Sequence, residues 1–306
     1  YLAGFGYTVA VMQRPDQLRR VARELVEDNA AEGVRYIEAR FAPQLHAREG
    51  WSTVEVLRAV NQGLQEGKDA FNRRPEVVSG AEPPFEYGII TCAMRYFDGN
   101  FSQYYRSFID LHRYSPRNRV WALAALELAQ AAVHARDEES IPVVGFDLAG
   151  PEEGYPPIDH REAYEFAHRH FLRKTVHAGE AYGPESIFQA ITELYAERIG
   201  HGTSLLNPAA VSDKSVTSRE HYVRDLAQFI ADRRVTIEVC LTSNQQTTPA
   251  YRNLADHPFG EMLRHRLSVS ICTDNRTVSN TTVTDELYKA ATTFDLTMKD
   301  LKNIIV

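Results

Sequence analysis

The chain has 306 residues, of which 43% are hydrophobic and 25% are charged, proportions that are ordinary for a globular protein. A chain of this length can bury a large core, so disulfide staples are not needed for folding. Acidic residues (41) outnumber basic residues (34), and the net charge of −7 argues against nucleic acid or an anionic membrane as the partner.

The cysteine pattern and the hydropathy pattern point to the same compartment. Cys92, Cys240 and Cys272 stand singly, and each lies inside or at the end of an apolar run. Such cysteines are typical of buried, reduced thiols. The sequence has no run of 18 apolar residues and does not open on a basic-then-apolar leader. We therefore expect a cytoplasmic protein.

Along the chain, segments with helical periodicity alternate with short apolar runs. The first predicted helix covers residues 15–32, with Leu18, Val21 and Leu25 on one face and Gly33 as the stop. Further helices are predicted over residues 53–71, 104–112, 119–135, 161–172 and 184–195. Strands are predicted over residues 34–41, 87–94, 143–148, 174–178, 198–200, 236–240 and 268–273.

The alternation of strands and helices predicts a parallel sheet with crossover helices. Seven strands are one short of the eight that close the usual barrel. We therefore expect an α/β fold, a (β/α)8 TIM barrel whose first strand lies upstream of Tyr1. Residues 1–306 are expected to form a single catalytic domain that is trimmed at both ends.

Polar or conformationally special residues lie at the ends of five predicted strands. They are Gly150, His177, His201, Asn244 and Asp274, in chain order. The C-terminal ends of parallel barrel strands form one rim, and that rim carries the active site in such folds. We expect these residues to share one site.

The residue types suit hydrolysis at a metal ion. His177 and Asp274 offer a nitrogen and an oxygen ligand, both of which Zn²⁺ accepts. Zinc lowers the pKa of a bound water to roughly 7, which yields hydroxide at neutral pH. Glu180 lies three residues beyond His177 and can supply a proton, while His201 brings a second imidazole. Gly150 would let a ligand approach the backbone closely.

The same stretches resemble the adenosine deaminase family over nearly the whole chain, from about Phe5 to Met298. The spacing of 24 positions between His177 and His201 makes the pair of central motifs specific. The matching segments are TVHAGE (175–180), RIGHGT (198–203), DLAG (147–150), EVCLTSN (238–244), CTDN (272–275), YIEARFAP (36–43) and CAMR (92–95).

The resemblance implies a role for each residue of the site. His177 and Asp274 would be zinc ligands, and Asp274 would also hold the zinc-bound hydroxide. Glu180 would protonate ring nitrogen N1 of the purine, which makes C6 electrophilic. His201 would orient the attacking hydroxide and stabilise the developing charge. Gly150 would donate a hydrogen bond to the purine through its backbone N–H.

Two positions depart from the family's pattern. Asn275 stands where many members carry a second Asp that contacts N7 of the purine, although an amide can still donate there. The family takes two more zinc ligands from a His-x-His motif on the first barrel strand, and the sequence has no such motif at a strand. His168 and His170 lie in a helical pattern and are expected to face solvent. We expect the natural protein to supply the motif upstream.

Three functions stay open. The first is deamination of adenosine or 2′-deoxyadenosine, and the second is the same reaction on adenine, aminodeoxyfutalosine or a modified adenine nucleoside. The third is an inactive nucleoside-binding relative. Ser243 lacks the surroundings of a serine-hydrolase nucleophile, and the cytidine-deaminase zinc motif is absent. Glu38, Arg40 and Arg95 are expected to form a buried ion network rather than to touch substrate.

Overall fold

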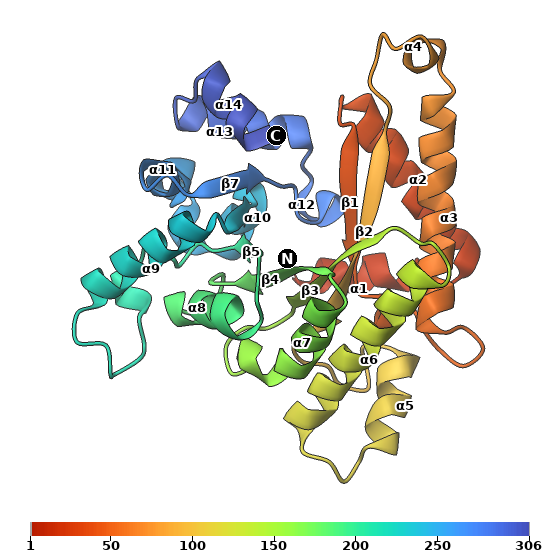
Figure 1. Ribbon diagram of the computed structural model, residues 1–306, viewed down its shortest axis with the longest axis horizontal. Helices are drawn as coiled ribbons and strands as arrows, with labels where there is room; N and C mark the ends of the chain where they lie inside the picture. The colour runs from red at the N-terminus through yellow and green to blue at the C-terminus, as the bar shows by residue number, and fades with distance from the viewer. Residues whose placement is uncertain (1, 306) are drawn as a thin grey trace. The chain divides into compact units, whose positions relative to one another are not determined.

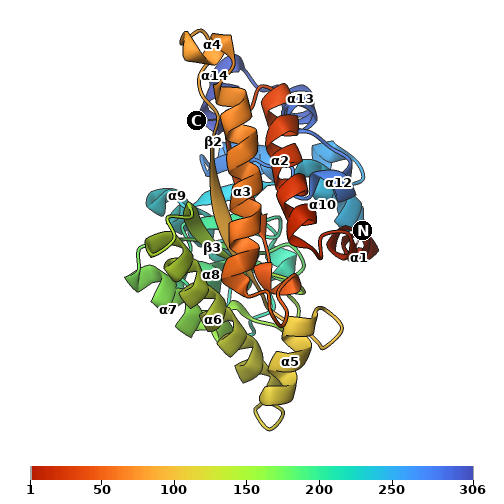
Figure 2. The ribbon, with the colours of Figure 1, turned by 90° about the vertical axis from the view of Figure 1, so that its right-hand side faces the viewer.

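The computed structural model describes residues 2–305 (Figures 1 and 2). The chain divides into two compact units. The N-terminal unit contains residues 2–148 and 159–173, and the C-terminal unit contains residues 149–158 together with the chain from residue 174 onward. Among the described residues, no helix is both long enough and apolar enough to cross a bilayer.

The N-terminal unit is built on three strands. Strand β1 (Tyr36–Phe41) pairs in parallel with β2 (Glu86–Met94), and β3 (Val143–Ala149) is third in the order. The helices of this unit are α1 (Leu2–Ala10), α2 (Pro15–Ala31), α3 (Thr53–Asn72), α4 (Pro75–Val78), α5 (Gln103–Leu111), α6 (Arg117–Asp137) and α7 (Arg161–Arg169), with the 3-10 turn η1 (Pro43–Leu45).

Helices α2 and α3 lie side by side in both ribbon views (Figures 1 and 2). A Cβ atom at Gly63 of α3 would overlap the backbone carbonyl of Arg19 in α2. A Cβ atom at Gly67 would overlap the side chain of Val26 in the same way. The close approach of the two helices therefore depends on glycine at both positions.

The C-terminal unit carries four parallel strands in chain order. They are β4 (Arg173–Ala178), β5 (Arg198–His201), β6 (Thr236–Val239) and β7 (Ser268–Ile271). His177 of β4 lies opposite Gly200 of β5, and Ala178 lies opposite His201. The helices are α8 (Pro184–Glu193), α9 (Arg219–Arg233), α10 (Leu241–Thr247), α11 (Phe259–Arg264), α12 (Arg276–Ser279), α13 (Val283–Thr293) and α14 (Met298–Ile305).

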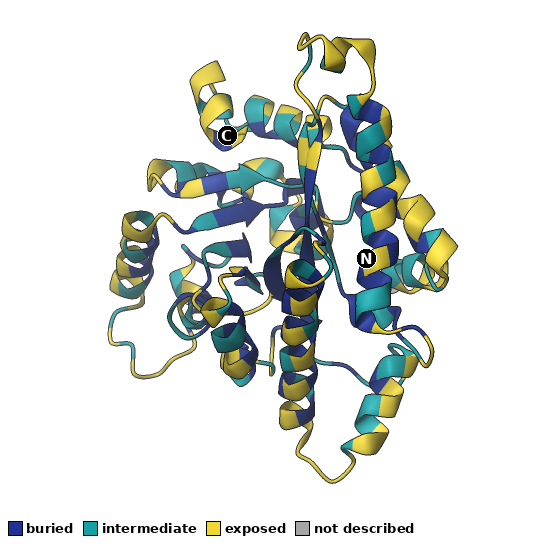
Figure 3. Cartoon of the chain, turned by 45° about the vertical axis from the view of Figure 1, so that its right-hand side comes forward, coloured by how far each residue is buried: buried dark blue, intermediate teal, exposed yellow. Residues whose placement is uncertain are grey.

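The strands supply much of the buried apolar core of each unit (Figure 3). Ile89 and Phe146 are fully buried in the N-terminal unit, and Val176, Ile199 and Ile237 are fully buried in the C-terminal unit. Burying a side chain of this size contributes roughly 1.5–3 kcal/mol. Apolar burial thus fixes the strands, and their polar end residues are placed as a consequence.

All seven predicted strands are present, and each observed end lies within two residues of its predicted position. The pairings within each unit are parallel and follow chain order, as a (β/α) barrel requires. The helix predicted over residues 161–172 ends earlier, at Arg169, because Phe171 takes a left-handed backbone with φ of 59°. Helices α10 and α12 are short and polar, so no helical periodicity marks their bounds in the sequence.

Two of the three residues predicted to form a buried ion network, Arg40 and Arg95, lie beside or among buried polar groups of the N-terminal unit. Asp147 is fully buried, lies 3.6 Å from the Arg40 guanidinium and accepts a hydrogen bond from the Cys92 thiol at 3.4 Å. Arg95 is also fully buried. The Glu38 carboxylate accepts the Tyr36 hydroxyl at 3.0 Å.

Candidate functional site

The six residues that were given a predicted role in the site all lie in the C-terminal unit. Each lies at or just beyond a strand end, as the parallel order places them. They are Gly150 after β3, His177 in β4, Glu180 after β4, His201 at the end of β5, and Asp274 and Asn275 after β7. The strand-end pattern in the sequence therefore predicted their position in the fold.

The backbone turns left-handed at three of these residues. The φ angles are 107° at Gly150, 67° at His201 and 54° at Asp274. Glycine adopts this region freely, whereas His and Asp adopt it only where the surrounding structure enforces it. Gly179, with φ of 71°, is required for a second reason, because a Cβ atom there would overlap Ile187. Two of the nine described non-glycine residues with positive φ thus lie at the ends of β5 and β7.

Two imidazoles and one carboxylate lie together at the ends of β4 and β5. The ring centroids of His177 and His201 are 5.2 Å apart. The Nε2 atom of His201 lies 3.7 Å from Oε2 of Glu180. The Thr247 hydroxyl of α10 lies 3.4 Å from Oε1 of the same carboxylate. Glu180 is therefore oriented from two sides.

Glu152 organises the loop that carries Glu180, although its role was not predicted from the sequence. Its Oε1 accepts the backbone N–H of Gly179 at 2.6 Å. Its Oε2 accepts the N–H groups of Glu180, Ala181 and Tyr182 at 3.1, 2.9 and 3.0 Å. Hydrogen bonds to a carboxylate are the stronger kind, and this one is buried. A signal was available, since Glu152 follows the strand-end Gly150 by two residues.

Asp274 is held by a hydroxyl from α10. The Ser243 hydroxyl donates to Oδ2 of Asp274 at 2.8 Å. Ser243 is fully buried and engaged with a carboxylate, which agrees with its exclusion as a serine-hydrolase nucleophile. The structure therefore gives Ser243 a supporting position beside a residue of the expected site.

Asn275 caps helix α12. Its Oδ1 accepts the N–H of Val278 at 2.9 Å. Because the oxygen is used in the cap, the NH₂ group is the donor that the side chain can offer to a ligand. An Asp at this position could not donate in its ionised form.

Two further buried residues, Asn244 and His257, form a chain of side-chain contacts with His201. Asn244 was expected at the site from its strand-end position, whereas His257 was not. The Asn244 amide nitrogen lies 3.1 Å from Nδ1 of His201. The Asn244 oxygen lies 3.2 Å from Nε2 of His257. Burial, followed by the proximity of His201, lowers the pKa of His257 to about 4. Asn244 follows β6 in the sequence, whereas nothing in the sequence marks His257.

The donor chemistry at the strand ends fits part of a zinc site. His177 and Asp274 offer the nitrogen and carboxylate oxygen that zinc prefers. Within the part of the chain that the structure describes, no cluster of three or more His, Cys, Asp or Glu side chains could hold a metal ion. Catalytic zinc sites use three protein ligands and a water, so these two residues fit as a subset of the ligands.

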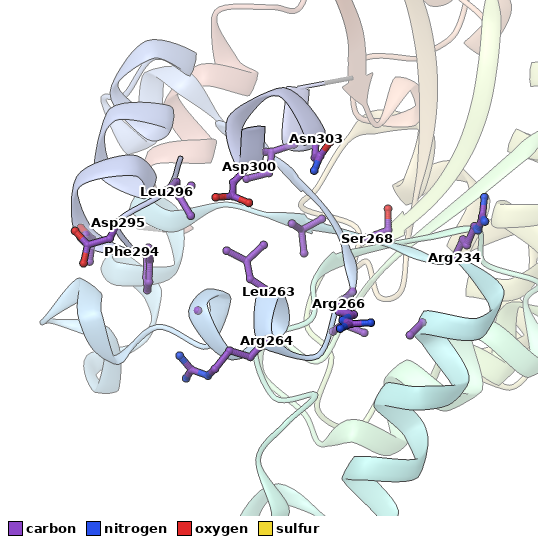
Figure 4. A pocket seen from close by; sticks show the side chains of 16 residues that line it. Arg234, Leu263, Arg264, Arg266, Ser268, Phe294, Asp295, Leu296, Asp300 and Asn303 are labelled. Carbon is purple, nitrogen blue, oxygen red and sulfur yellow. The ribbon is translucent and has the colours of Figure 1, made fainter. Parts of the chain in front are cut away.

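A pocket of about 840 Å³ lies elsewhere in the C-terminal unit (Figure 4). Its lining includes Leu263, Phe294 and Leu296, and it reaches Ser268, the first residue of β7. Asp274 follows the opposite end of that strand. The pocket therefore does not coincide with the candidate site.

Known proteins that are similar to this chain were found by sequence and by structure. The profile of the family described as adenosine deaminase matches residues 1–113 and 116–306. Adenosine deaminase of Mycobacterium marinum is 36% identical over 306 residues, which cover 100% of this chain and 74% of that protein. Adenosine deaminase 1 of Streptomyces coelicolor is 34% identical over 302 residues, covering 99% and 66%.

Solved structures agree on the fold. An amidohydrolase from Burkholderia ambifaria, solved with bound zinc, superposes with a TM-score of 0.72 at 22% identity and covers 96% of this chain and 67% of its own. Adenine deaminase from Arthrobacter aurescens gives a TM-score of 0.71 at 22% identity, with coverage of 99% and 77%. At this identity the likeness concerns the fold, and the predicted (β/α)-barrel class is confirmed.

Proposed function

The chain belongs to the adenosine deaminase family, and on that premise we propose that it converts adenosine and 2′-deoxyadenosine to inosine and 2′-deoxyinosine. The reaction consumes one water and releases one ammonia. A bond forms between C6 of the purine and the water oxygen, and the bond between C6 and the amino nitrogen breaks. The leaving nitrogen departs as ammonia after it takes up a proton.

One observation carries the proposal: Glu180 and His201 face each other at neighbouring strand ends, 3.7 Å apart. In the proposed roles, the Glu180 carboxyl group gives a proton to N1 of the purine, which draws electrons away from C6. His201 orients the attacking oxygen and stabilises charge that develops there. In the proposed roles Asp274, which accepts a hydrogen bond from Ser243, also accepts one from the attacking oxygen.

The proposed cofactor is one zinc ion, which supplies an activated water at neutral pH. His177 and Asp274 would hold it together with two histidines of a His-x-His motif that the 306 residues do not provide at a strand. Gly150 would bind the purine through its backbone N–H, and Asn275 would donate to N7 through its NH₂ group. We propose that residues 1–306 belong to one catalytic domain acting on a small purine nucleoside in the cytoplasm.

A change of substrate within the same chemistry is the alternative that an observation favours. Asn275 presents an amide where many family members carry Asp, and its oxygen is engaged in capping α12. Because the side chain expected at N7 differs from the usual Asp, turnover of adenine or of a modified adenine nucleoside should be compared directly with turnover of adenosine. Equal or faster turnover of free adenine than of adenosine would favour this alternative.

The test is release of ammonia from adenosine by the full-length protein supplied with zinc. We expect release that a chelator abolishes and that added zinc restores. Protein with about one bound zinc per chain that releases no ammonia from adenosine would contradict the substrate assignment. Protein that binds adenosine without turning over any aminopurine would instead support the inactive nucleoside-binding relative.

A further inference from the structure

We propose that Asn244 and His257 are positioning residues that fix the tautomer of His201, so that its imidazole carries hydrogen on Nε2. This inference rests on the proposed function, because it defines what His201 presents to the reacting centre. The three side chains come from different elements of the C-terminal unit. His201 ends β5, Asn244 lies in α10, and His257 directly precedes the turn into α11.

The direction of the chain of hydrogen bonds is set by a backbone amide. The N–H of Phe259 points at Nδ1 of His257, at 3.1 Å. A backbone N–H only donates, so Nδ1 of His257 accepts and the hydrogen of this ring lies on Nε2. That Nε2–H group then donates to Oδ1 of Asn244, at 3.2 Å.

The orientation of the Asn244 amide follows from this donor. If the amide were reversed, its NH₂ group would face Nε2 of His257. The imidazole would then have to accept a hydrogen bond at both ring nitrogens and could carry a hydrogen on neither. A neutral imidazole cannot satisfy that arrangement. The NH₂ group therefore faces His201 and donates to its Nδ1 at 3.1 Å.

The consequence for His201 is a fixed tautomer. Because Nδ1 accepts a hydrogen bond, the neutral ring carries its hydrogen on Nε2. That nitrogen lies 3.7 Å from the Glu180 carboxylate. His201 thus acts as a hydrogen-bond donor toward an oxygen at the reacting centre, and it does not serve there as a base.

Burial keeps the chain of contacts free of competing water. Asn244 is fully buried, and His201 and His257 are each 3% exposed. Burial lowers the pKa of His257 to about 4, so this ring stays neutral at physiological pH and keeps one hydrogen. The backbone at His201 is left-handed, with φ of 67°.

The direct test is a nitrogen-15 NMR spectrum of histidine side chains in the full-length protein, with the His201 signals assigned from a His201→Gln spectrum. We expect hydrogen on Nε2 in the wild type. Asn244→Asp keeps the shape but accepts hydrogen from both rings, so His201 should switch to the Nδ1–H form. Hydrogen on Nδ1 in the wild type, or an unchanged tautomer in Asn244→Asp, would overturn the proposal.

Kinetics give a second readout with a matched pair at position 257. His257→Gln and His257→Leu both remove the ring Nδ1 that accepts the Phe259 N–H, but only Gln keeps a donor for Asn244. We expect kcat to fall roughly 10–100-fold in His257→Leu, with little change in KM, and to recover largely in His257→Gln. Equal loss in the two variants would count against the proposal.

A control variant tests whether the tautomer change is specific to Asn244, and the NMR readout does not depend on the proposed deaminase activity. Gln246→Glu places the same amide-to-carboxylate change on an exposed residue of α10 and should leave the His201 spectrum unchanged. If the wild type fails to deaminate adenosine, the proposed function fails, yet the spectra still decide the tautomer.

Discussion

At the scale of single residues, the site combines unusual backbone with closely held side chains. His201 and Asp274 both adopt positive φ, at 67° and 54°. Such conformations cost of order 1–3 kcal/mol each when a non-glycine residue adopts them. The hydrogen bonds from Asn244 to His201 and from Ser243 to Asp274 help to hold these side chains in place. The two residues with a costly backbone conformation are therefore also the two whose side chains are held by hydrogen bonds from α10.

The first prediction concerns Glu180→Gln. Glutamine keeps the shape of the side chain but has no acidic proton, so kcat for adenosine should fall by roughly 10²–10⁴-fold. Ammonia release measures the rate, and calorimetry should show that nucleoside binding is retained. Glu220→Gln, an exposed change at the start of α9, is the control. Turnover close to wild type would refute the assigned role of Glu180.

The sequence predicted the site residues that sit on strand ends, because strand ends are marked by the change from apolar to polar residues. It placed Asn244 at the same strand ends without giving it a role, and it missed Glu152 and His257. Their importance arises from the backbone amides and side chains they meet in the folded unit. His257 lies between Asp256 and Pro258 in an irregular stretch, where no periodicity indicates burial.

At the scale of elements, short connections hold the site in position. The loop after β4 is held by Glu152, while α10 supplies Ser243 and Asn244. Helix α10 covers only seven residues and begins directly after β6, so its sequence shows too few turns for a hydrophobic stripe. Long helices such as α3 were predicted closely because their periodicity extends over several turns.

The second prediction concerns Glu152→Gln. The amide has one acceptor oxygen and no charge, so it cannot satisfy the four N–H groups of residues 179–182. We expect the free energy of unfolding to fall by about 2 kcal/mol or more, since buried donors lose a charged acceptor. Urea denaturation measures the change. Glu153→Gln alters the exposed neighbouring carboxylate and is the matched control; equal effects in both variants would contradict the assignment.

The third prediction concerns the contact between α2 and α3. Gly63→Ala forces a Cβ atom against the Arg19 carbonyl, so the helices must separate and the protein should lose about 1–3 kcal/mol of stability. Gly6→Ala in α1 is the control, because no atom lies within 4 Å of its added Cβ. That variant should gain roughly 0.5–1 kcal/mol from helix propensity. Thermal unfolding of both variants distinguishes packing from propensity.

At the scale of the whole molecule, both units contain buried neutral histidines. Burial lowers the pKa of His46 to about 4. Burial, and then the charge of Arg95, lowers the pKa of His160 to about 3. His257, with its pKa of about 4, is the counterpart in the C-terminal unit. Acid should therefore weaken both units through the same physical cause.

The fourth prediction is the pH dependence of stability. Unfolded histidine has a pKa near 6.5, so between about pH 6.5 and 4 the unfolded state binds more protons than the folded state. The contribution of these histidines to the free energy of unfolding should be fully present above pH 6.5. As the pH drops below that value, the free energy of unfolding should fall by about 1.4 kcal/mol per pH unit for each such histidine. Urea denaturation across this range measures the slope. His46→Gln should lower this slope by the share of one histidine, about 1.4 kcal/mol per pH unit. The exposed His221→Gln is the control and should leave the slope unchanged.

The contacts of Glu152 also constrain how the chain can be divided. The polypeptide passes between the two units at residues 148–149, 158–159 and 173–174, so the C-terminal unit is not one continuous stretch. A recombinant fragment that begins at residue 174 would contain β4 to β7 but lack Glu152. Its β4–α8 loop would have lost the carboxylate that orders it. Any minimal expression boundary for this unit must therefore reach back through residue 149, together with the intervening helix α7.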